Sequence, residues 1–81
     1  MEDLAIQQRV KATMSKVFGV EVSEINDLSS QDTIEKWDSL GHFNLVVALE
    51  EEFQIQLNDS QIVELLNYKL IVTTVKEILH L

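Results

Sequence analysis

Apolar residues recur every three or four positions within residues 3–17, which is the spacing of one face of an α-helix. Glu2 and Asp3 lie where the helix dipole favours negative charge, and Lys16 lies where it favours positive charge. The pattern predicts an amphipathic helix over residues 3–17. Its apolar positions are Ile6, Val10, Met14 and Val17.

The same spacing returns more strongly after residue 37. Asp38 and Ser39 are residue types favoured at helix starts, and a broad apolar stripe follows them as far as Phe53. We therefore expect a second helix that begins at Asp38 or Ser39. The stripe consists of Leu40, Phe43, Leu45, Val46, Leu49 and Phe53.

Between these two helices, residues 18–37 show no sustained period and are rich in Ser, Asp and Asn. Apolar residues are nevertheless scattered through the segment, which indicates an ordered loop pinned to the core. They are Val20, Val22, Ile25, Leu28, Ile34 and Trp37.

The C-terminal part predicts two further helices. Asn58 and Gln61 form a capping pair ahead of a short third helix whose apolar face is Ile62, Leu65 and Leu66. Thr74 and Glu77 fit a capping box, which predicts a last helix from there to near Leu81. Residues 70–72 form an ambiguous apolar run that is also compatible with a strand. The pattern as a whole predicts an all-α four-helix bundle of three longer helices and one short helix, with the long loop between the first two.

Composition narrows the class of protein. Eighty-one residues suffice for one domain, residues 1–81, and the absence of cysteine excludes disulfides, thiolate ligands and a cysteine nucleophile. No apolar run approaches the ~20 residues that span a bilayer, and the N-terminal residues are acidic where a signal peptide is basic. We expect a cytoplasmic monomer with no membrane insertion.

The formal net charge is −8, and its distribution is uneven. Residues 37–68 contain six acidic and no basic side chains. Such a surface repels nucleic acid and anionic lipid and attracts basic protein surfaces. A solvated acidic face that only maintains solubility explains the charge equally well.

Catalytic and metal sites are poorly supported. Ser39 and His42 are three residues apart at a helix start and could face each other, but a hydrolase also needs an orienting acid, an oxyanion hole and a pocket. We expect His42 and His80 to be exposed, and the protein not to be an enzyme. Residues 27–38 lack the glycine that a calcium loop requires at its turn. No metal site is expected.

One constellation remains: the segment Trp37-Asp38-Ser39-Leu40-Gly41, followed by a helix that ends in Leu49-Glu50-Glu51-Glu52-Phe53. With this spacing, the preceding loop and the Thr73-Thr74-Val75 opening of the last helix, the sequence resembles the acyl carrier protein superfamily, which includes peptidyl and D-alanyl carriers. The resemblance implies that the serine of the Asp-Ser-Leu triplet, Ser39, bears a covalent 4'-phosphopantetheine arm that holds acyl groups as thioesters. It also implies no catalytic activity of its own.

The resemblance further implies partners and a surface that recognises them. The partners are a phosphopantetheinyl transferase and acyl-loading or acyl-transferring enzymes with basic docking patches. Asp38 is expected to act as an N-cap and also as part of what the transferase recognises. Leu40 fits a core residue and a recognition residue equally well. The expected partner-recognition residues are Asp38, Leu40, Asn44, Val47, Glu50 and Glu51.

The sequence also departs from the family pattern. Gly41 stands where fatty-acid-synthesis carriers have an acidic residue, Asn44 stands where they have glutamate, and the stretch from Phe53 to Thr73 reads as longer than in compact relatives. An aminoacyl, peptidyl or D-alanyl carrier is therefore an alternative to a carrier for fatty-acid or related biosynthesis. An unmodified acidic protein-binding adaptor, with Ser39 serving only as a cap, is the alternative of a different class.

Overall fold

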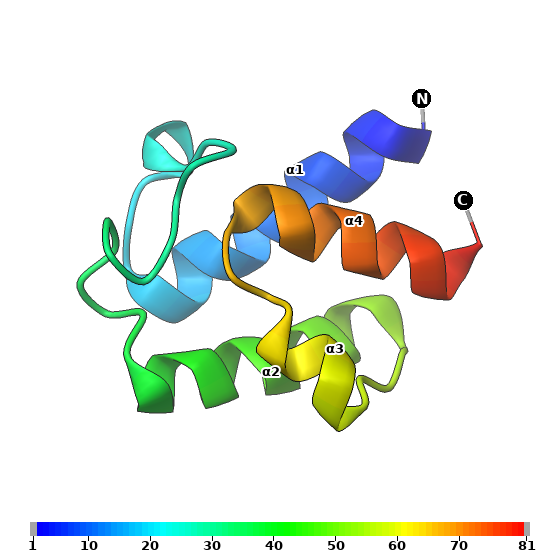
Figure 1. Ribbon diagram of the computed structural model, residues 1–81. Helices are drawn as coiled ribbons and strands as arrows, with labels where there is room; N and C mark the ends of the chain where they lie inside the picture. Colours follow the sequence, from blue (N-terminus) through cyan, green and yellow to red (C-terminus); the bar gives the residue numbers. More distant parts are fainter. Residues whose placement is uncertain (1, 81) are drawn as a thin grey trace.

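The computed structural model describes residues 2–80 as helices around one hydrophobic core (Figure 1). Within these residues no strand forms, and β-pairing is limited to one isolated bridge between Ser30 and Asn67. The predicted all-α fold, with three longer helices, one short helix and a long first loop, is confirmed. The elements are α1 (Glu2–Phe18), the 3₁₀ helix η1 (Val22–Glu24), α2 (Ser39–Phe53), α3 (Asp59–Val63) and α4 (Tyr68–Leu79).

Helix α1 organises the bundle, because it packs against both α2 and α4. The start of α1 and the end of α4 lie on one side of the bundle, and the long loop lies on the opposite side (Figure 1). An ion pair between Lys76 and Asp3 joins the two helices at that side. The buried face of α1 consists of Ile6, Val10, Met14 and Phe18.

The long first loop is fixed at some of its apolar residues and not at others. Ile25, Ile34 and Trp37 are buried in the core, whereas Val22 and Leu28 are exposed. The prediction that the last two anchor the loop is wrong. Local hydrogen bonds hold that part instead, since the side chain of Asn26 accepts from the N–H of Leu28 and so closes a turn by itself.

The boundary of α4 corrects the sequence prediction. The helix begins at Tyr68, and its N-cap is Asn67, whose side-chain oxygen accepts from the N–H of Leu70 at 2.8 Å. Thr74 is a buried residue in the middle of α4, so Thr74 and Glu77 are not a capping box. The ambiguous residues 70–72 are helical, because Tyr68, Ile71, Val72 and Val75 bury one face at helical spacing.

The predicted short third helix forms as α3, but it ends at Val63, so Leu65 and Leu66 lie beyond it and not on its apolar face. Asn58 and Gln61 make a reciprocal capping box, with N–H to oxygen distances of 2.8 and 2.9 Å. Leu65, just beyond the helix, is buried, whereas Leu66 is exposed and does not join the core. None of the helices within residues 2–80 is long and apolar enough to cross a membrane.

Candidate functional site

Ser39 is the first residue of α2, and its side chain is exposed. Asp38 caps the helix as expected, since its carboxylate accepts from the N–H of Gly41 at 2.8 Å. The first N–H groups of a helix have no acceptor within the helix, so the backbone around Ser39 presents donors and the positive end of the dipole. The hydroxyl therefore stands at a position that is accessible and electrostatically suited to a phosphodiester.

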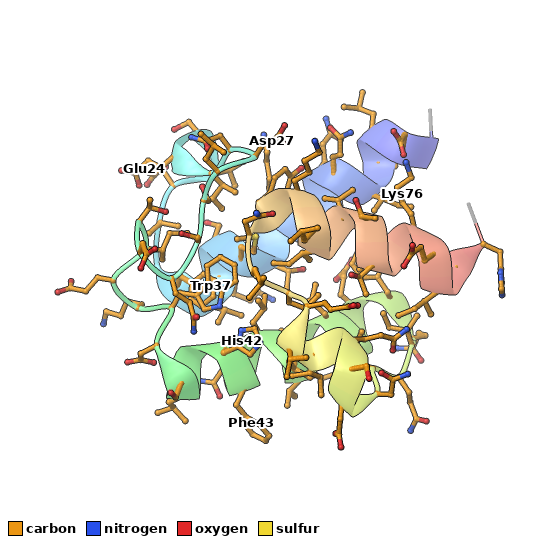
Figure 2. All side chains as sticks on the ribbon, viewed as in Figure 1. Glu24, Asp27, Trp37, His42, Phe43 and Lys76 are labelled. Atoms are coloured by element: carbon orange, nitrogen blue, oxygen red, sulfur yellow. The ribbon has the colours of Figure 1, made fainter. Side chains whose placement is uncertain are left out.

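An apolar strip runs along α2 beside this serine. Leu40, Phe43 and Val47 are 69%, 64% and 40% exposed, and their spacing places them on one face of the helix. Figure 2 shows Phe43 pointing away from the bundle. Of the two interpretations of Leu40, the core one is wrong, and so is the inclusion of Phe43 in the core stripe, because the buried face of α2 lies on the other side of the helix. It consists of Gly41, Leu45, Val46, Leu49 and Phe53.

The three consecutive glutamates of α2 have three different environments. Glu50 is only partly exposed, and its carboxylate accepts from the backbone N–H of Leu57 at 2.9 Å. It therefore holds the connection between α2 and α3. Glu51 is exposed, as is Asn44 on the same helix. The structure thus leaves Asn44, Val47 and Glu51 on the surface expected for recognition and gives Glu50 a structural contact.

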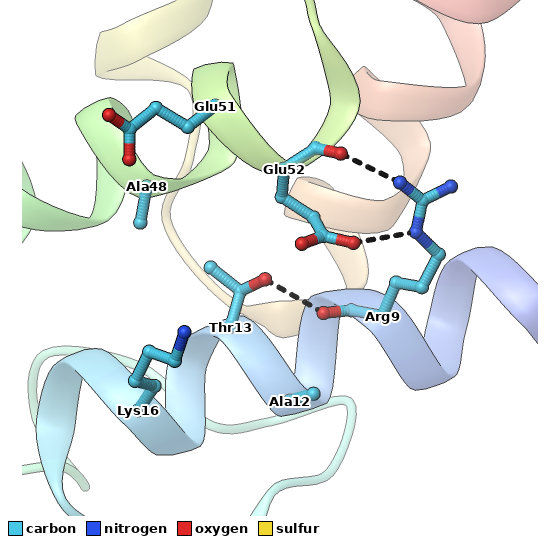
Figure 3. A pocket seen from close by; sticks show the side chains of 7 residues that line it. All are labelled: Arg9, Ala12, Thr13, Lys16, Ala48, Glu51 and Glu52. Atoms are coloured by element: carbon cyan, nitrogen blue, oxygen red, sulfur yellow. Dashed lines mark hydrogen bonds and ion pairs between the residues drawn. The ribbon is translucent and has the colours of Figure 1, made fainter.

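Glu52 faces α1 across a surface groove of about 310 Å³ (Figure 3). The guanidinium of Arg9 donates to the carboxylate and to the backbone carbonyl of Glu52, both at 2.7 Å, and lies 4.4 Å from the centre of the Phe53 ring. Both side chains of the ion pair are substantially exposed, so its contribution to stability is small. The pair nevertheless orients Glu52 towards α1 and away from Leu40 and Phe43.

His42 differs most from its expected position. The prediction that it is an exposed first-turn residue is wrong: it is half-buried, and both ring nitrogens have partners. Trp37 Nε1 donates to His42 Nδ1 at 2.9 Å, and His42 Nε2 lies 2.9 Å from the carbonyl oxygen of Ile62. No ring nitrogen remains for Ser39, which removes the geometric basis for a Ser–His hydrolase. His80, the C-cap of α4, is exposed as expected.

Gly41 also has a role that sequence reasoning did not find. A Cβ at this position would overlap the backbone carbonyl oxygen of Lys36, so the loop crosses the first turn of α2 in contact with the glycine. No periodic or motif signal indicates such a contact. Any side chain at this position, acidic or not, would meet the same carbonyl oxygen.

Within residues 2–80 the chain thus forms four α-helices, and an exposed serine behind an aspartate N-cap opens the second of them. No family model matches the sequence. Among known proteins, the chain is similar to an acyl carrier protein of Buchnera aphidicola subsp. Schizaphis graminum (strain Sg), with 34% identity over 55 residues, which cover 67% of this chain and 68% of that protein. The chain belongs to the acyl carrier protein family.

Proposed function

We propose that Ser39 is the attachment site of a 4'-phosphopantetheine arm, and that the protein carries acyl groups as thioesters on that arm. The observation that supports this most directly is the exposed Ser39 as the first residue of α2, behind the Asp38 cap. When attached, the arm supplies the terminal thiol that this cysteine-free chain lacks. The chain's own part is to present the serine, stabilise the phosphate with the helix start and dock to partners.

The exposed face of α2 is the docking surface in this proposal. Leu40, Phe43 and Val47 would supply apolar contact, and Asn44 and Glu51 would lie beside them. The partners would be a phosphopantetheinyl transferase and acyl-loading or acyl-transferring enzymes with basic patches, because residues 37–68 carry six acidic and no basic side chains. Asp38 contributes chiefly by capping α2, and Glu50 by holding Leu57.

The cargo in this proposal is an acyl group of fatty-acid or related biosynthesis, handled in the cytoplasm. Aminoacyl, peptidyl or D-alanyl cargo is the alternative within the same carrier class. An unmodified acidic adaptor is the alternative outside it. Mass spectrometry of the protein purified from its host separates the carrier from the adaptor, because only the carrier bears the added arm, and the mass of the native thioester identifies the cargo.

The direct test is modification by a broad-specificity phosphopantetheinyl transferase with coenzyme A, followed by intact-mass analysis. We expect one arm per chain and none on Ser39→Ala. The matched control is Ser60→Ala, because Asp59 and Ser60 form the other Asp-Ser pair of the chain, also exposed at a helix start. Modification of Ser39→Ala, or a native chain that is never modified while its circular dichroism shows a folded protein, would refute the proposal.

A further inference from the structure

A surface groove of about 320 Å³ lies between α4 and the connection that leads into it from α3. Figure 1 shows this connection rising from α3 to the start of α4. In the described part of the chain the lining comes from the connection and from α4, so the groove is separate from the exposed face of α2. The lining consists of Glu64, Leu66, Leu70, Thr73, Thr74 and Glu77.

Two leucines supply the apolar part of this groove. Leu66 is 60% exposed, and Leu70, in the first turn of α4, is 37% exposed. The buried face of α4 lies on the other side of the helix, since Ile71, Val72 and Val75 are the residues that enter the core. A single exposed leucine needs no explanation, but two that share a groove with polar residues around them are typical of an interaction site.

Thr73 lies in the middle of the groove side of α4, three residues after Leu70 and four before Glu77. These spacings place the three side chains on one face of the helix. The Thr73 hydroxyl donates to the carbonyl oxygen of Lys69 at 3.0 Å, so its proton is already bonded inside the helix. An occupant of the groove therefore need not supply an acceptor there.

Both charged residues of the lining are glutamates. Glu77 belongs to the last turn of α4, and Glu64 is the C-cap of α3. Carboxylates at these positions oppose the helix dipole, so helix stability does not account for them. Both residues are exposed, and neither takes part in the ion pairs of residues 2–80. The groove thus offers two carboxylates to a cation from outside.

The chemistry of the lining selects the occupant. The leucines favour an apolar contact, and the glutamates favour cations beside it. Nucleic acid and a second copy of this chain, whose net charge is −8, are disfavoured by repulsion. An amphipathic helix binds to a groove through apolar residues about one turn apart, and lysine or arginine on its flanks would meet Glu64 and Glu77.

We propose that this groove is a second docking surface, which binds a basic amphipathic helix of a partner protein through Leu66, Leu70 and the two glutamates. The contact goes beyond the proposed arm attachment, since it uses neither Ser39 nor the exposed face of α2. A groove of this size covers only part of a helix, so the complex is weak and transient.

The test uses a synthetic helical peptide with a stripe of leucines bordered by lysines, added to the bare ¹⁵N-labelled chain and followed by amide chemical shifts. We expect the shift changes to concentrate in residues 64–77 and not in α2. A peptide of the same composition in scrambled order has the same charge but no apolar face, and it should bind at least about tenfold more weakly.

Variants make the result specific to the groove, with affinity measured by the fluorescence anisotropy of the labelled peptide. Leu66→Gln should weaken binding roughly tenfold, because it removes an exposed apolar anchor and leaves the core unchanged. Leu28→Gln, at an exposed leucine of the long loop, and Phe43→Gln, on the exposed face of α2, should bind as the native chain does.

The charge contribution is tested by the double variant Glu64→Gln, Glu77→Gln. It should weaken binding about threefold to tenfold at low salt and less at high salt, because exposed charges are screened. Native affinity of Leu66→Gln, equal binding of the scrambled peptide, shifts confined to α2, or no binding at all would each overturn the proposal.

Modification by the phosphopantetheinyl transferase separates this surface from the proposed function. Leu66→Gln should receive the arm as fast as the native chain, because the transferase is expected to meet α2. A variant that lost peptide binding and modification together would show that the groove is part of the same docking surface, against the proposal. If the native chain never receives an arm, the proposed function fails, and the peptide measurements on the bare chain still decide whether the groove binds.

Discussion

A methyl group on Gly41 would overlap the backbone carbonyl oxygen of Lys36, which lies directly against the first turn of α2. The loop can therefore reach Asp38 and the helix start only because residue 41 has no side chain. Two opposed effects act on Gly41→Ala. Helix propensity favours alanine by about 0.5–1 kcal/mol, whereas overpacking against backbone costs about 1–3 kcal/mol.

We expect the steric effect to dominate, so Gly41→Ala should lower the free energy of unfolding by about 1–2 kcal/mol. The other glycine provides the control. Gly19 has a φ of +68° and nothing within 4 Å of a Cβ, so Gly19→Asn, a residue that tolerates this conformation, should cost less than about 0.5 kcal/mol. Urea unfolding of both variants measures the difference. A Gly41→Ala protein as stable as the native one would show that the loop has another path.

Charge reversal of an acidic residue is expected to slow association with basic partners most where that residue lies on the exposed face of α2. Glu51 is exposed near the C-terminal end of α2, and Glu77 is exposed near the C-terminal end of α4. Reversal of either to lysine changes net charge equally and improves the match with the helix dipole equally. We expect Glu51→Lys to slow modification by the transferase roughly threefold to tenfold at low salt, and Glu77→Lys to slow it much less.

Added salt should reduce this difference, because exposed charges are screened beyond a Debye length of about 8 Å at physiological ionic strength. Equal rates for the two reversals would mean that net charge, and not the α2 surface, governs the encounter. Glu50→Lys is unsuitable for this test. It removes the acceptor of the Leu57 N–H and should cost about 1.5–3 kcal/mol of stability.

Local signals explain which parts of the structure were predictable. Asp38 with the stripe that ends at Phe53, and the pair Asn58 and Gln61, specify α2 and α3 through contacts within a few residues. Sequence alone places the start of α4 too late, because Thr74 and Glu77 match a capping pattern by spacing alone. Asn67, the actual cap, lacks a glutamate or glutamine three residues later.

The site was predictable only in part, for a related reason. Ser39 and its cap could be found from adjacent residues. The bond from His42 to Ile62 joins residues twenty positions apart, and the separate environments of Glu50 and Glu52 depend on how α2 packs against its neighbours. Such contacts leave no periodic trace in the sequence. They can be identified only from the packed structure.

The N-cap of α4 gives a direct test of the corrected boundary. Asn67→Ala should cost about 1 kcal/mol, because the N–H of Leu70 loses its acceptor, whereas Asn67→Ser retains a capping oxygen and should cost much less. Amide exchange of Leu70 should accelerate in the first variant only. If neither variant affected this amide, Asn67 would not be the helix start.

Tyr68 makes stability dependent on pH in the alkaline range. Burial, and to a smaller extent the negative charge of Asp27, raise the pKa of this phenol above its usual value of 10.0. Its hydroxyl also donates to the backbone carbonyl of Gln7 at 3.2 Å, a contact that requires the proton. The folded protein therefore retains the phenolic proton at a pH where the unfolded chain has begun to lose it.

The sign of the effect follows from proton binding. Above pH 10.0 the unfolded state binds fewer protons at this site than the folded state, so the free energy of unfolding falls as pH rises from 10.0 through the raised pKa. Below pH 10.0 the contribution of Tyr68 to stability is complete. Tyr68→Phe removes the contribution of the phenol alone, so urea unfolding of both proteins should show a steeper alkaline decline for the native chain. Because Tyr68 is the single tyrosine, phenolate absorbance reports its titration directly, and Asp27→Asn should shift that titration to lower pH. A phenolate titration of the folded protein at or below that of the urea-unfolded chain would contradict the burial of this hydroxyl.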